Sequence, residues 1–346
     1  MIKKTKSKKI QLVNRAAMFR LALFAIFLSI IIFTGWFIMI RMPGKSYRGQ
    51  LPPLTPSEII LQNNLKQTVE KLSQEIGEHN FIFYKNLVTA ADFLDDSLVK
   101  YGYKVQRQGY EISGKKYYNL EVEIPGTDKA NEIVIIGGHY DSVTASPGAN
   151  DNSSGAAGVL ELARIFAGKN ISRTLRFVEF VNEEPPFFWT PDMGSMVYAK
   201  RCQARGEKIM AMLSLETIGY YSDIPGSQKY PFPLDLIYPG TGDFIAFVGN
   251  IDSGNLVRNV ISLFRKYAQF PSEGAALPGK IPGVGWSDHW SFWQYNYPAL
   301  MVTDTAPFRY PYYHTEEDTP DKINYDRMAR VVAGLEKVIS DLVGIK

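Results

Sequence analysis

The sequence has a single cysteine, Cys202, in 346 residues. One cysteine excludes an intramolecular disulfide and a zinc cluster built from thiolates. The surrounding run KRCQARG is typical of the exposed basic end of a helix, so we interpret Cys202 as inert rather than as a nucleophile. Histidine is also scarce: the chain has four, which makes the place of each one informative.

Acidic residues are absent from residues 1–20, which hold seven lysines and arginines. Removing these seven charges from the net charge of +3 leaves −4 for the rest of the chain. The basic balance therefore belongs to the N-terminal tail, and we expect no binding of nucleic acid by the main domain. With 45% hydrophobic and 13% aromatic residues, the chain is rich enough in apolar side chains to form a core and is not a disordered composition.

Charge is also missing from residues 21–40, LALFAIFLSIIIFTGWFIMI. Twenty helical residues span about 30 Å, the thickness of the hydrocarbon layer of a bilayer. Arg20 and Arg41 bracket the run, and Trp36 lies near its far end, where aromatic residues meet the membrane interface. The run predicts a transmembrane helix that anchors the chain in a lipid bilayer.

A cleaved signal peptide is the alternative for this run. Its apolar core would be shorter and a small-residue cleavage site would follow, whereas RMPGKSYRG follows here, so we favour a retained signal anchor. Seven basic residues precede the run and three follow it (Arg41, Lys45, Arg48), which predicts a single-pass protein with a cytoplasmic N-terminus. The expected organisation is a basic cytoplasmic tail (1–20), a transmembrane helix (21–40), a linker (41–55) and one extracytoplasmic domain, periplasmic or extracellular (56–346).

The rest of the chain alternates between helical and strand patterns. Thr55, Pro56 and Glu58 form a helix-start signal with a capping box, and Gly77 is a suitable stop. We expect further helices at about 84–101, 154–167 and 326–343, a strand pair around residues 113–114, and strands around the apolar runs 133–136, 175–181, 209–215 and 299–302. This pattern predicts an α/β fold: a mostly parallel mixed sheet with helices on both faces. We interpret segments 222–242 and 268–287 as long loops.

A possible metal ligand follows each of the four apolar runs. These residues are His139, the pair Glu183–Glu184, Glu216 and His314, and Asp151 precedes the helix after the first run. In open α/β sheets, sites form outside the carboxyl ends of the strands, so we expect these side chains to meet. Taken singly, each has an ordinary explanation as a turn, a helix cap or a core histidine; their joint placement at strand ends favours a site.

Imidazole and carboxylate ligands without thiolates suit catalytic zinc. Two ions about 3.5–4 Å apart need a bridging carboxylate, and such a pair polarises a carbonyl group and activates water. A carboxylate that is not a ligand must then take the proton of that water. Of two successive glutamates at one strand end, one could bind the metal and the other could take the proton from the water.

Six motifs in order, GGHYDSV, GANDNSSG, NEEPPF, SLETIG, GWSDHWSF and YYHTEEDTPDKI, resemble the M28 family of zinc metallopeptidases. This family includes bacterial aminopeptidases, glutamate carboxypeptidase II and the transferrin-receptor fold, and the resemblance covers about residues 59–346. It implies a zinc-exopeptidase fold and zinc as cofactor. Two ions per chain are expected. Many family members have aspartate where this chain has Glu216, and this departure leaves one ion as the alternative.

The resemblance implies a role for each matching residue. His139 and Glu216 would hold one zinc ion and Glu184 and His314 the other, with Asp151 between them. Glu183 would be the general base, and Tyr313 would help to stabilise the oxyanion. Supporting residues around these would be Asp141, which would orient the ligand histidine, together with Asp288 and His289.

The function implied is a membrane-anchored zinc-dependent exopeptidase that acts on peptides, and we expect an aminopeptidase that hydrolyses N-terminal residues. A glutaminyl-peptide cyclotransferase, which uses the same sheet with a reduced zinc site, is the alternative from another reaction class. A non-catalytic receptor-like ectodomain is disfavoured, because all five ligands and the base are present. Seven aromatic residues either line a side-chain pocket or pack under loops: Phe187, Phe188, Trp189, Tyr220, Tyr221, Phe270 and Trp286.

Overall fold

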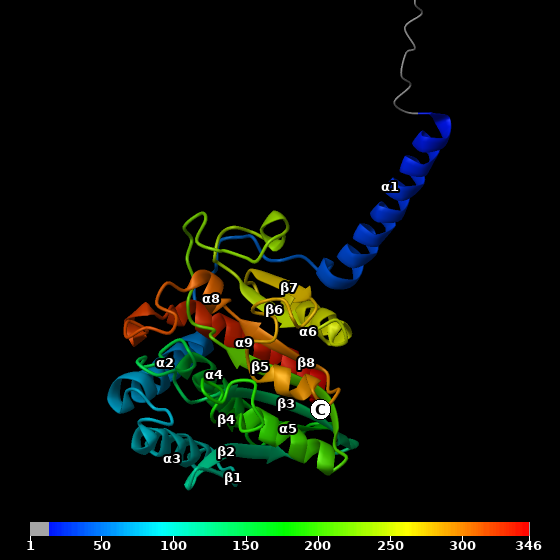
Figure 1. Ribbon diagram of the computed structural model, residues 1–346. Coiled ribbons are helices and arrows are strands. Elements are labelled where there is room, and N and C mark those ends of the chain that lie inside the picture. Colours follow the sequence, from blue (N-terminus) through cyan, green and yellow to red (C-terminus); the bar gives the residue numbers. More distant parts are fainter. Residues whose placement is uncertain (1–13, 346) are drawn as a thin grey trace, which may run out of the picture.

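The computed structural model describes residues 14–345, and its centre is a mixed sheet of eight strands with helices on both faces (Figure 1). The strand order is β1-β2-β4-β3-β5-β8-β6-β7. The pairs β3–β4, β3–β5, β5–β8 and β6–β7 are parallel, and β1–β2, β2–β4 and β6–β8 are antiparallel. The predicted α/β class with a mostly parallel mixed sheet is confirmed.

The strands have these bounds: β1 Gln106–Ile112, β2 Lys115–Ile124, β3 Lys129–His139, β4 Arg173–Phe180, β5 Lys208–Glu216, β6 Ile245–Gly249, β7 Ser272–Ala276 and β8 Ala299–Thr303. The α-helices are α1 Arg15–Gly35, α2 Pro56–Glu70, α3 Tyr84–Lys100, α4 Ser153–Phe166, α5 Gly194–Ala204, α6 Gly254–Tyr267, α7 His289–Trp293, α8 Ala306–Arg309 and α9 Tyr325–Val343. Two π-helical turns, Trp36–Ile40 and Lys71–Ile76, extend α1 and α2, and 3₁₀ turns cover Leu234–Leu236 and Pro320–Lys322.

Local signals explain where several of these elements begin and end. The Thr55 hydroxyl accepts a hydrogen bond from the backbone N–H of Glu58, and the Glu58 carboxylate accepts one from the backbone N–H of Thr55, so the predicted capping box starts α2. Gly77 ends the following π-helical turn with a φ of 76°, a conformation that glycine adopts without strain. The predicted strand pair turns at Ser113 and Gly114.

The sheet is packed between two hydrophobic layers, one on each face. Helices α2, α3, α4, α6 and α9 lie over one face and share the larger core, in which the apolar stripe of α9 is buried. Helices α5 and α7 cover the other face, where Tyr198, Phe180 and Phe292 pack together. Both faces of the central strands are therefore shielded from water, which suits their nearly continuous apolar sequences.

Three expectations are corrected. Segment 268–287 is not only loop, because Ser272–Ala276 forms edge strand β7; its small residues give no strand signal, and pairing with β6 decides its conformation. Cys202 is not exposed: it lies at the end of α5 as predicted, but with its side chain in the second core. Leu342, which the apolar spacing of the last helix predicts to be buried, is only partly buried. Strand β6 and helix α6 are not among the expected elements.

The N-terminal helix begins earlier than expected. Residues 15–20, assigned to the basic tail, are the first turns of α1, whereas residues 1–13 of that tail lie outside the described residues. From Arg15 to Ile40 the helix is long and apolar enough to cross a membrane, a property that it shares with signal sequences. Figure 1 shows α1 projecting away from the sheet and its helices.

Candidate metal centre

The carboxyl ends of adjacent strands bring the predicted ligands together. His139 is the last residue of β3 and Glu216 the last of β5, and Glu183 and Glu184 follow β4. Asp151 lies two residues before α4, and His314 lies in the segment between α8 and α9. Strand β3 pairs with β4 on one side and with β5 on the other, so the chain reverses its direction of winding here. Such a switch point is where open α/β sheets form their sites.

Asp151 lies between the two histidines. One of its carboxylate oxygens is 3.4 Å from His139 Nε2, and the other is 3.0 Å from His314 Nε2. Glu216 Oε2 is 3.2 Å from His139 Nε2, and Glu184 Oε1 is 3.5 Å from His314 Nε2. The donors thus form two groups that share Asp151, which is the arrangement that a bridging carboxylate requires.

Glu183 lies at the edge of the first group. Its Oε2 atom is 3.8 Å from His139 Nε2, farther than either Glu216 or Asp151. Its donor atom still falls within 4.8 Å of those of His139 and Glu216, so the carboxylate faces the same space. A carboxylate in this position can reach a water molecule held by the group.

The donor set fits a metal ion. His139 Nε2 and Glu184 Oε1 are buried atoms that have no hydrogen-bond partner among the described residues, and both face the cluster. Buried polar atoms are seldom left unpaired, and a cation held between them would satisfy both. Imidazole nitrogen with carboxylate oxygen, and no thiolate, is the ligand chemistry of catalytic zinc.

The electrostatics of the cluster favour a positive charge among its carboxylates. Burial raises the pKa of Glu183 and of Glu184 well above the ordinary value, and neighbouring carboxylates add to this effect. Burial opposes protonation of His139, but the carboxylates of Glu216 and Glu183 still raise its pKa well above the ordinary value. A divalent cation among these side chains would favour the ionised carboxylates and the neutral imidazole.

The structure gives Asp141 a different contact from the one implied by the resemblance. The ring Nδ1–H of His139 donates to the backbone carbonyl of Asp141 at 3.0 Å, whereas the nearer carboxylate oxygen is 3.6 Å away. The carboxylate instead accepts the backbone N–H groups of Glu183 and Glu184, both at 3.1 Å. Asp141 thus fixes the His139 ring through its main chain and the glutamate pair through its side chain.

Two further supporting residues lie within the quoted motifs GWSDHWSF and YYHTEEDTPDKI but were not singled out from the sequence. The Ser287 hydroxyl donates to Glu216 Oε2 at 2.8 Å. Asp318 is buried and accepts the backbone N–H groups of Asn150 and Asp151 at 2.8 and 3.1 Å, which holds the segment that carries Asp151. Asp318 lies four residues after His314 in the same motif, and this short distance is the signal that could have found it.

Asp288 and His289 are buried beside the cluster rather than in it. His289 Nε2 pairs with the carbonyl oxygen of Val284 at 2.8 Å, and the ring meets Trp293 edge to face. Burial lowers the pKa of His289 to about 4, so the ring is neutral and donates this hydrogen bond. Burial raises the pKa of Asp288 to about 7, and its carboxylate oxygens have no hydrogen-bond partner among the described residues.

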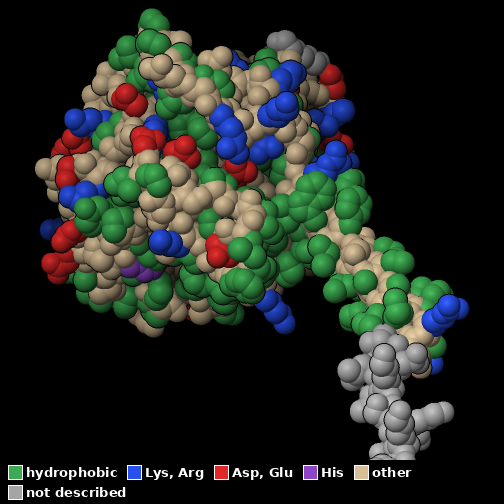
Figure 2. Space-filling view, turned by 90° about the horizontal axis from the view of Figure 1, so that it is seen from above, with side chains coloured by type: hydrophobic (Ala, Val, Ile, Leu, Met, Phe, Trp, Pro, Cys, Tyr) green, Lys and Arg blue, Asp and Glu red, His purple; other side chains and the backbone are tan. Residues whose placement is uncertain are grey.

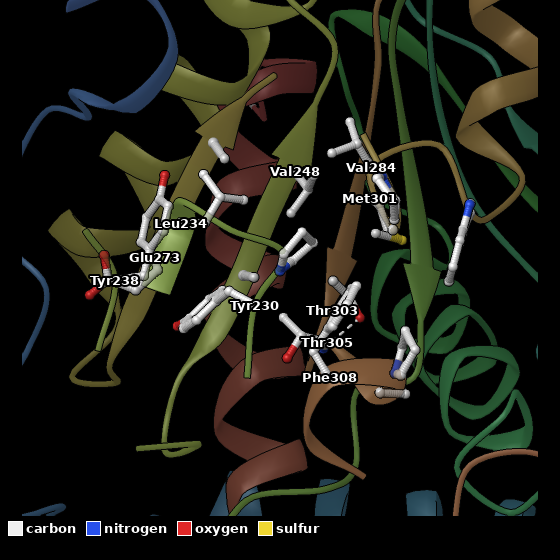
Figure 3. Close-up of a pocket in the computed structure, with 18 of the residues that line it drawn as sticks. Tyr230, Leu234, Tyr238, Val248, Glu273, Val284, Met301, Thr303, Thr305 and Phe308 are labelled. Carbon is white, nitrogen blue, oxygen red and sulfur yellow. Dashed lines mark hydrogen bonds between the residues drawn. The ribbon is translucent and has the colours of Figure 1, made fainter. Parts of the chain in front are cut away.

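A pocket opens beside Glu216 and Tyr313. Tyr313 stacks on the His314 ring with centroids 3.8 Å apart, and it lines the pocket together with Glu216. Most other lining side chains are apolar, and Figure 3 shows Thr303 and Met301 on one side and Tyr238 with Glu273 on the other. The cavity, about 810 Å³ including its mouth, is large enough for an amino-acid side chain.

One of the seven aromatic residues considered for a pocket wall lines this cavity, and it is Trp286. The others pack elsewhere: Phe187 against Phe81 and Tyr117, Phe188 and Trp189 against each other, Tyr220 against Tyr310, and Tyr221 against Phe270. The aromatic wall comes instead from Tyr230, Tyr238, Phe244 and Phe308.

Comparison with known proteins supports the same chemistry. Residues 119–339 match the family described as Peptidase family M28. A protein of Escherichia coli K12 called Uncharacterized protein YfbL is 39% identical over 280 residues, which are 78% of this chain and 85% of that protein. A probable leucine aminopeptidase of Arthroderma otae is 30% identical over 259 residues, which are 70% of this chain and 61% of that relative.

Solved structures share the fold. A zinc aminopeptidase from Bacillus subtilis has a TM-score of 0.66 at 14% identity, with 82% of this chain and 95% of that one covered. A glutaminyl cyclase from Porphyromonas gingivalis has a TM-score of 0.62 at 18% identity, with 82% and 98% covered. The fold thus occurs with both of the reaction classes considered from the sequence.

Proposed function

The chain belongs to peptidase family M28, and on that premise we propose that it is a membrane-anchored zinc aminopeptidase. The observation that carries the proposal is the position of Asp151, whose two carboxylate oxygens face His139 and His314. A single carboxylate between two imidazoles, with one further carboxylate beside each, provides two places for divalent ions. Aminopeptidase names among the relatives support the choice of reaction.

We assign His139 and Glu216 to one zinc ion and Glu184 and His314 to the other, with Asp151 as the shared ligand. Bound zinc would polarise the carbonyl group of the substrate and lower the pKa of a water molecule. The alternative of one ion stays open in this proposal. Glu216 is one methylene group longer than the aspartate of many family members. The Ser287 hydroxyl donates a hydrogen bond to one of its carboxylate oxygens, which fixes the position of the longer side chain.

Glu183 acts as the general base. Its carboxylate faces the space between the donors, and burial raises its pKa, which makes the ionised carboxylate a stronger base towards the attacking water. The same proton then passes to the amine that leaves when the peptide bond breaks. Asp141 holds the backbone N–H groups of Glu183 and Glu184, which keeps the base and the adjacent ligand in fixed relative positions.

Tyr313 and the pocket act on the substrate. The Tyr313 ring stacks on His314, and we assign its hydroxyl group as a donor to the oxyanion that forms at the attacked carbonyl. The neighbouring pocket takes the side chain of the N-terminal residue. Because leucine, valine, alanine and aromatic side chains dominate its lining, we expect large apolar residues to be preferred.

The proposed organisation is a cytoplasmic tail (1–20), a transmembrane helix (21–40), a linker (41–55) and a catalytic domain (56–346) outside the cytoplasm. The helix Arg15–Ile40, whose side chains are almost all exposed, supports a membrane location. The excess of basic residues before the helix supports the orientation.

Glu183→Gln tests the proposal in the full-length protein. The change keeps the size and polarity of the side chain but removes the base, so kcat on aminoacyl fluorogenic substrates should fall by about 10²–10⁴-fold. Zinc content measured by mass spectrometry should stay within about 20% of wild type, because other residues hold the metal. The matched control is Glu316→Gln, an exposed glutamate next to the site. Full activity in Glu183→Gln, or wild-type activity that resists chelation, would refute the assignment.

Cyclisation of N-terminal glutamine is the second candidate, because glutaminyl cyclases share the fold. The presence of His139 and Glu216 beside Asp151 favours hydrolysis, since the cyclases use a reduced zinc site. Incubation with glutaminyl peptides separates the two functions: a cyclase releases ammonia and leaves the peptide bonds intact, whereas an aminopeptidase releases free glutamine.

A further inference from the structure

The end of the N-terminal helix is fixed to the wall of the catalytic domain. Met39 and Ile40 pack against a small apolar cluster formed by Ala275, Leu277 and Val284. The Arg258 guanidinium donates a hydrogen bond of 2.8 Å to the carbonyl oxygen of Ile38. The helix therefore leaves the domain at a defined place, next to edge strand β7 and helix α6.

The loop over residues 222–242 meets the same apolar cluster from the other side. Leu234 and Tyr238 pack against it, so the loop and the end of the helix share one set of neighbours. Tyr238 is further held by a hydrogen bond of 2.8 Å from its hydroxyl to the carbonyl oxygen of Gly274 in β7. Figure 1 shows this loop rising on the side of the domain from which α1 departs.

The outer side chains of this loop are unusually exposed for apolar residues. Phe232, Leu236 and Ile224 are 83%, 76% and 70% exposed, more than any other large hydrophobic side chain in the described part of the chain, the N-terminal helix included. Ile237 is exposed to 47%. Scattered single residues of this kind are ordinary, but four in one loop mark a contact surface.

Charge around the helix exit fits a bilayer surface. Arg41, Lys45 and Arg48 follow the helix directly and are exposed. Figure 2 shows Lys and Arg side chains gathered near the place where the helix leaves the domain. Basic residues at the level of the headgroups, beside apolar side chains that reach deeper, are the pattern of a membrane-surface segment.

We infer that the loop carrying Ile224, Phe232, Leu236 and Ile237 inserts its apolar side chains into the surface of the same bilayer that the N-terminal helix crosses. The loop acts as a second, shallow contact that fixes the tilt of the catalytic domain. This inference depends on the retained anchor of the proposed function but not on catalysis.

The inner face of the loop gives this contact a consequence for the substrate. Tyr230, Leu234 and Tyr238 line the pocket beside Glu216 (Figure 3). One short segment thus contacts lipid on its outer face and forms the pocket wall on its inner face, so the pocket opens close to the membrane surface. Peptides held at that surface are then the substrate class that this arrangement serves best.

Site-directed fluorescence in full-length protein tests the contact. Cys202 is buried, so a single introduced cysteine can be labelled selectively with an environment-sensitive nitrobenzoxadiazole dye. Phe232→Cys and Leu236→Cys would be compared in phosphatidylcholine–phosphatidylglycerol vesicles with Ile30→Cys within the helix and Asp96→Cys on exposed α3. The dyes at 232 and 236 should show blue-shifted emission and quenching by lipids that carry a nitroxide near the headgroup, and the dye at 30 should be quenched by lipids that carry a nitroxide near the end of the acyl chain. The dye at 96 should show neither effect.

Water-like emission at positions 232 and 236 together with quenching at position 30 would overturn the inference and leave the anchor intact. Absence of quenching at position 30 would overturn the anchor and the loop contact together.

A kinetic experiment tests the consequence for the substrate. It uses the double variant Phe232→Asp with Leu236→Asp, and neither residue lines the pocket. Turnover of a soluble aminoacyl substrate should stay within twofold of wild type, and kcat/KM for a vesicle-bound lipopeptide should fall at least fivefold. Equal effects on both substrates, or none on the lipopeptide, would contradict the substrate consequence.

Discussion

Replacing Asp141 by asparagine distinguishes two possible roles of its carboxylate. One is to hold the backbone of Glu183 and Glu184, and the other is to orient the His139 ring. The Asp141 carboxylate accepts the backbone N–H groups of both Glu183 and Glu184 at 3.1 Å. Asparagine keeps one acceptor oxygen and turns an NH₂ group towards the second N–H. A buried donor left without an acceptor costs about 1–3 kcal/mol, and the lost bond is assisted by charge. We therefore expect the free energy of unfolding to fall by about 2–3 kcal/mol.

The effect on metal binding should be unequal. His139 keeps its hydrogen bond, because the acceptor is the backbone carbonyl of residue 141 and not the side chain. Glu184 loses part of its support, so we expect the zinc affinity of its site to fall by about 10–100-fold, the range for supporting residues of metal ligands. The site with His139 and Glu216 should change less.

Urea unfolding and zinc titration by calorimetry measure the two effects in Asp141→Asn. Asp96→Asn, on the exposed surface of α3, is the control and should match wild type in both measurements. An Asp141→Asn protein with wild-type stability and two unchanged zinc affinities would refute the contact between this carboxylate and the glutamate backbone. Equal weakening of both sites would show that the carboxylate orients His139 after all.

Three other changes have expected outcomes. Ser287→Ala removes the donor to Glu216 and should weaken zinc binding by about 10-fold in calorimetry; unchanged affinity would contradict a supporting role. The pKa values of Glu183 and Glu184 are raised in the folded apoprotein, so their contribution to stability is lost as pH rises through the folded values. The gain in Tm on adding zinc to chelated protein should therefore grow between about pH 5 and pH 8, and a constant gain would argue against the cluster. Thr55→Ala removes the cap of α2 and should lower the free energy of unfolding by about 1 kcal/mol in urea, with no change in kcat; a neutral result would mean that the cap is dispensable.

The strands that carry the metal ligands could be predicted from the sequence. Apolar runs bounded by polar or glycine residues identify strands β3, β4, β5 and β8, and parallel strands put their carboxyl ends at one edge. His139 and Glu216 end their strands, so strand prediction alone brings them close. Helix capping at Thr55 and Gly77 is likewise local, and local signals survive in the folded chain.

Features decided by tertiary packing could not be predicted in this way. The run around Cys202 is basic, and only the approach of β4 and α7 places the sulfur in a core. Strand β7 consists of small residues apart from Glu273, and it forms because β6 offers a partner. The contact of the Asp141 carboxylate with two backbone N–H groups depends on the turn after β4, which no sequence pattern specifies. The pocket wall depends on how loop 222–242 folds over the sheet.

Anomalous X-ray diffraction at the zinc absorption edge, from crystals of the zinc-loaded protein, tests the central claim most directly. The account predicts anomalous density in contact with Asp151: one peak shared with His139 and Glu216, and, if both places are filled, a second shared with Glu184 and His314. A map with no peak within bonding distance of Asp151 would contradict it.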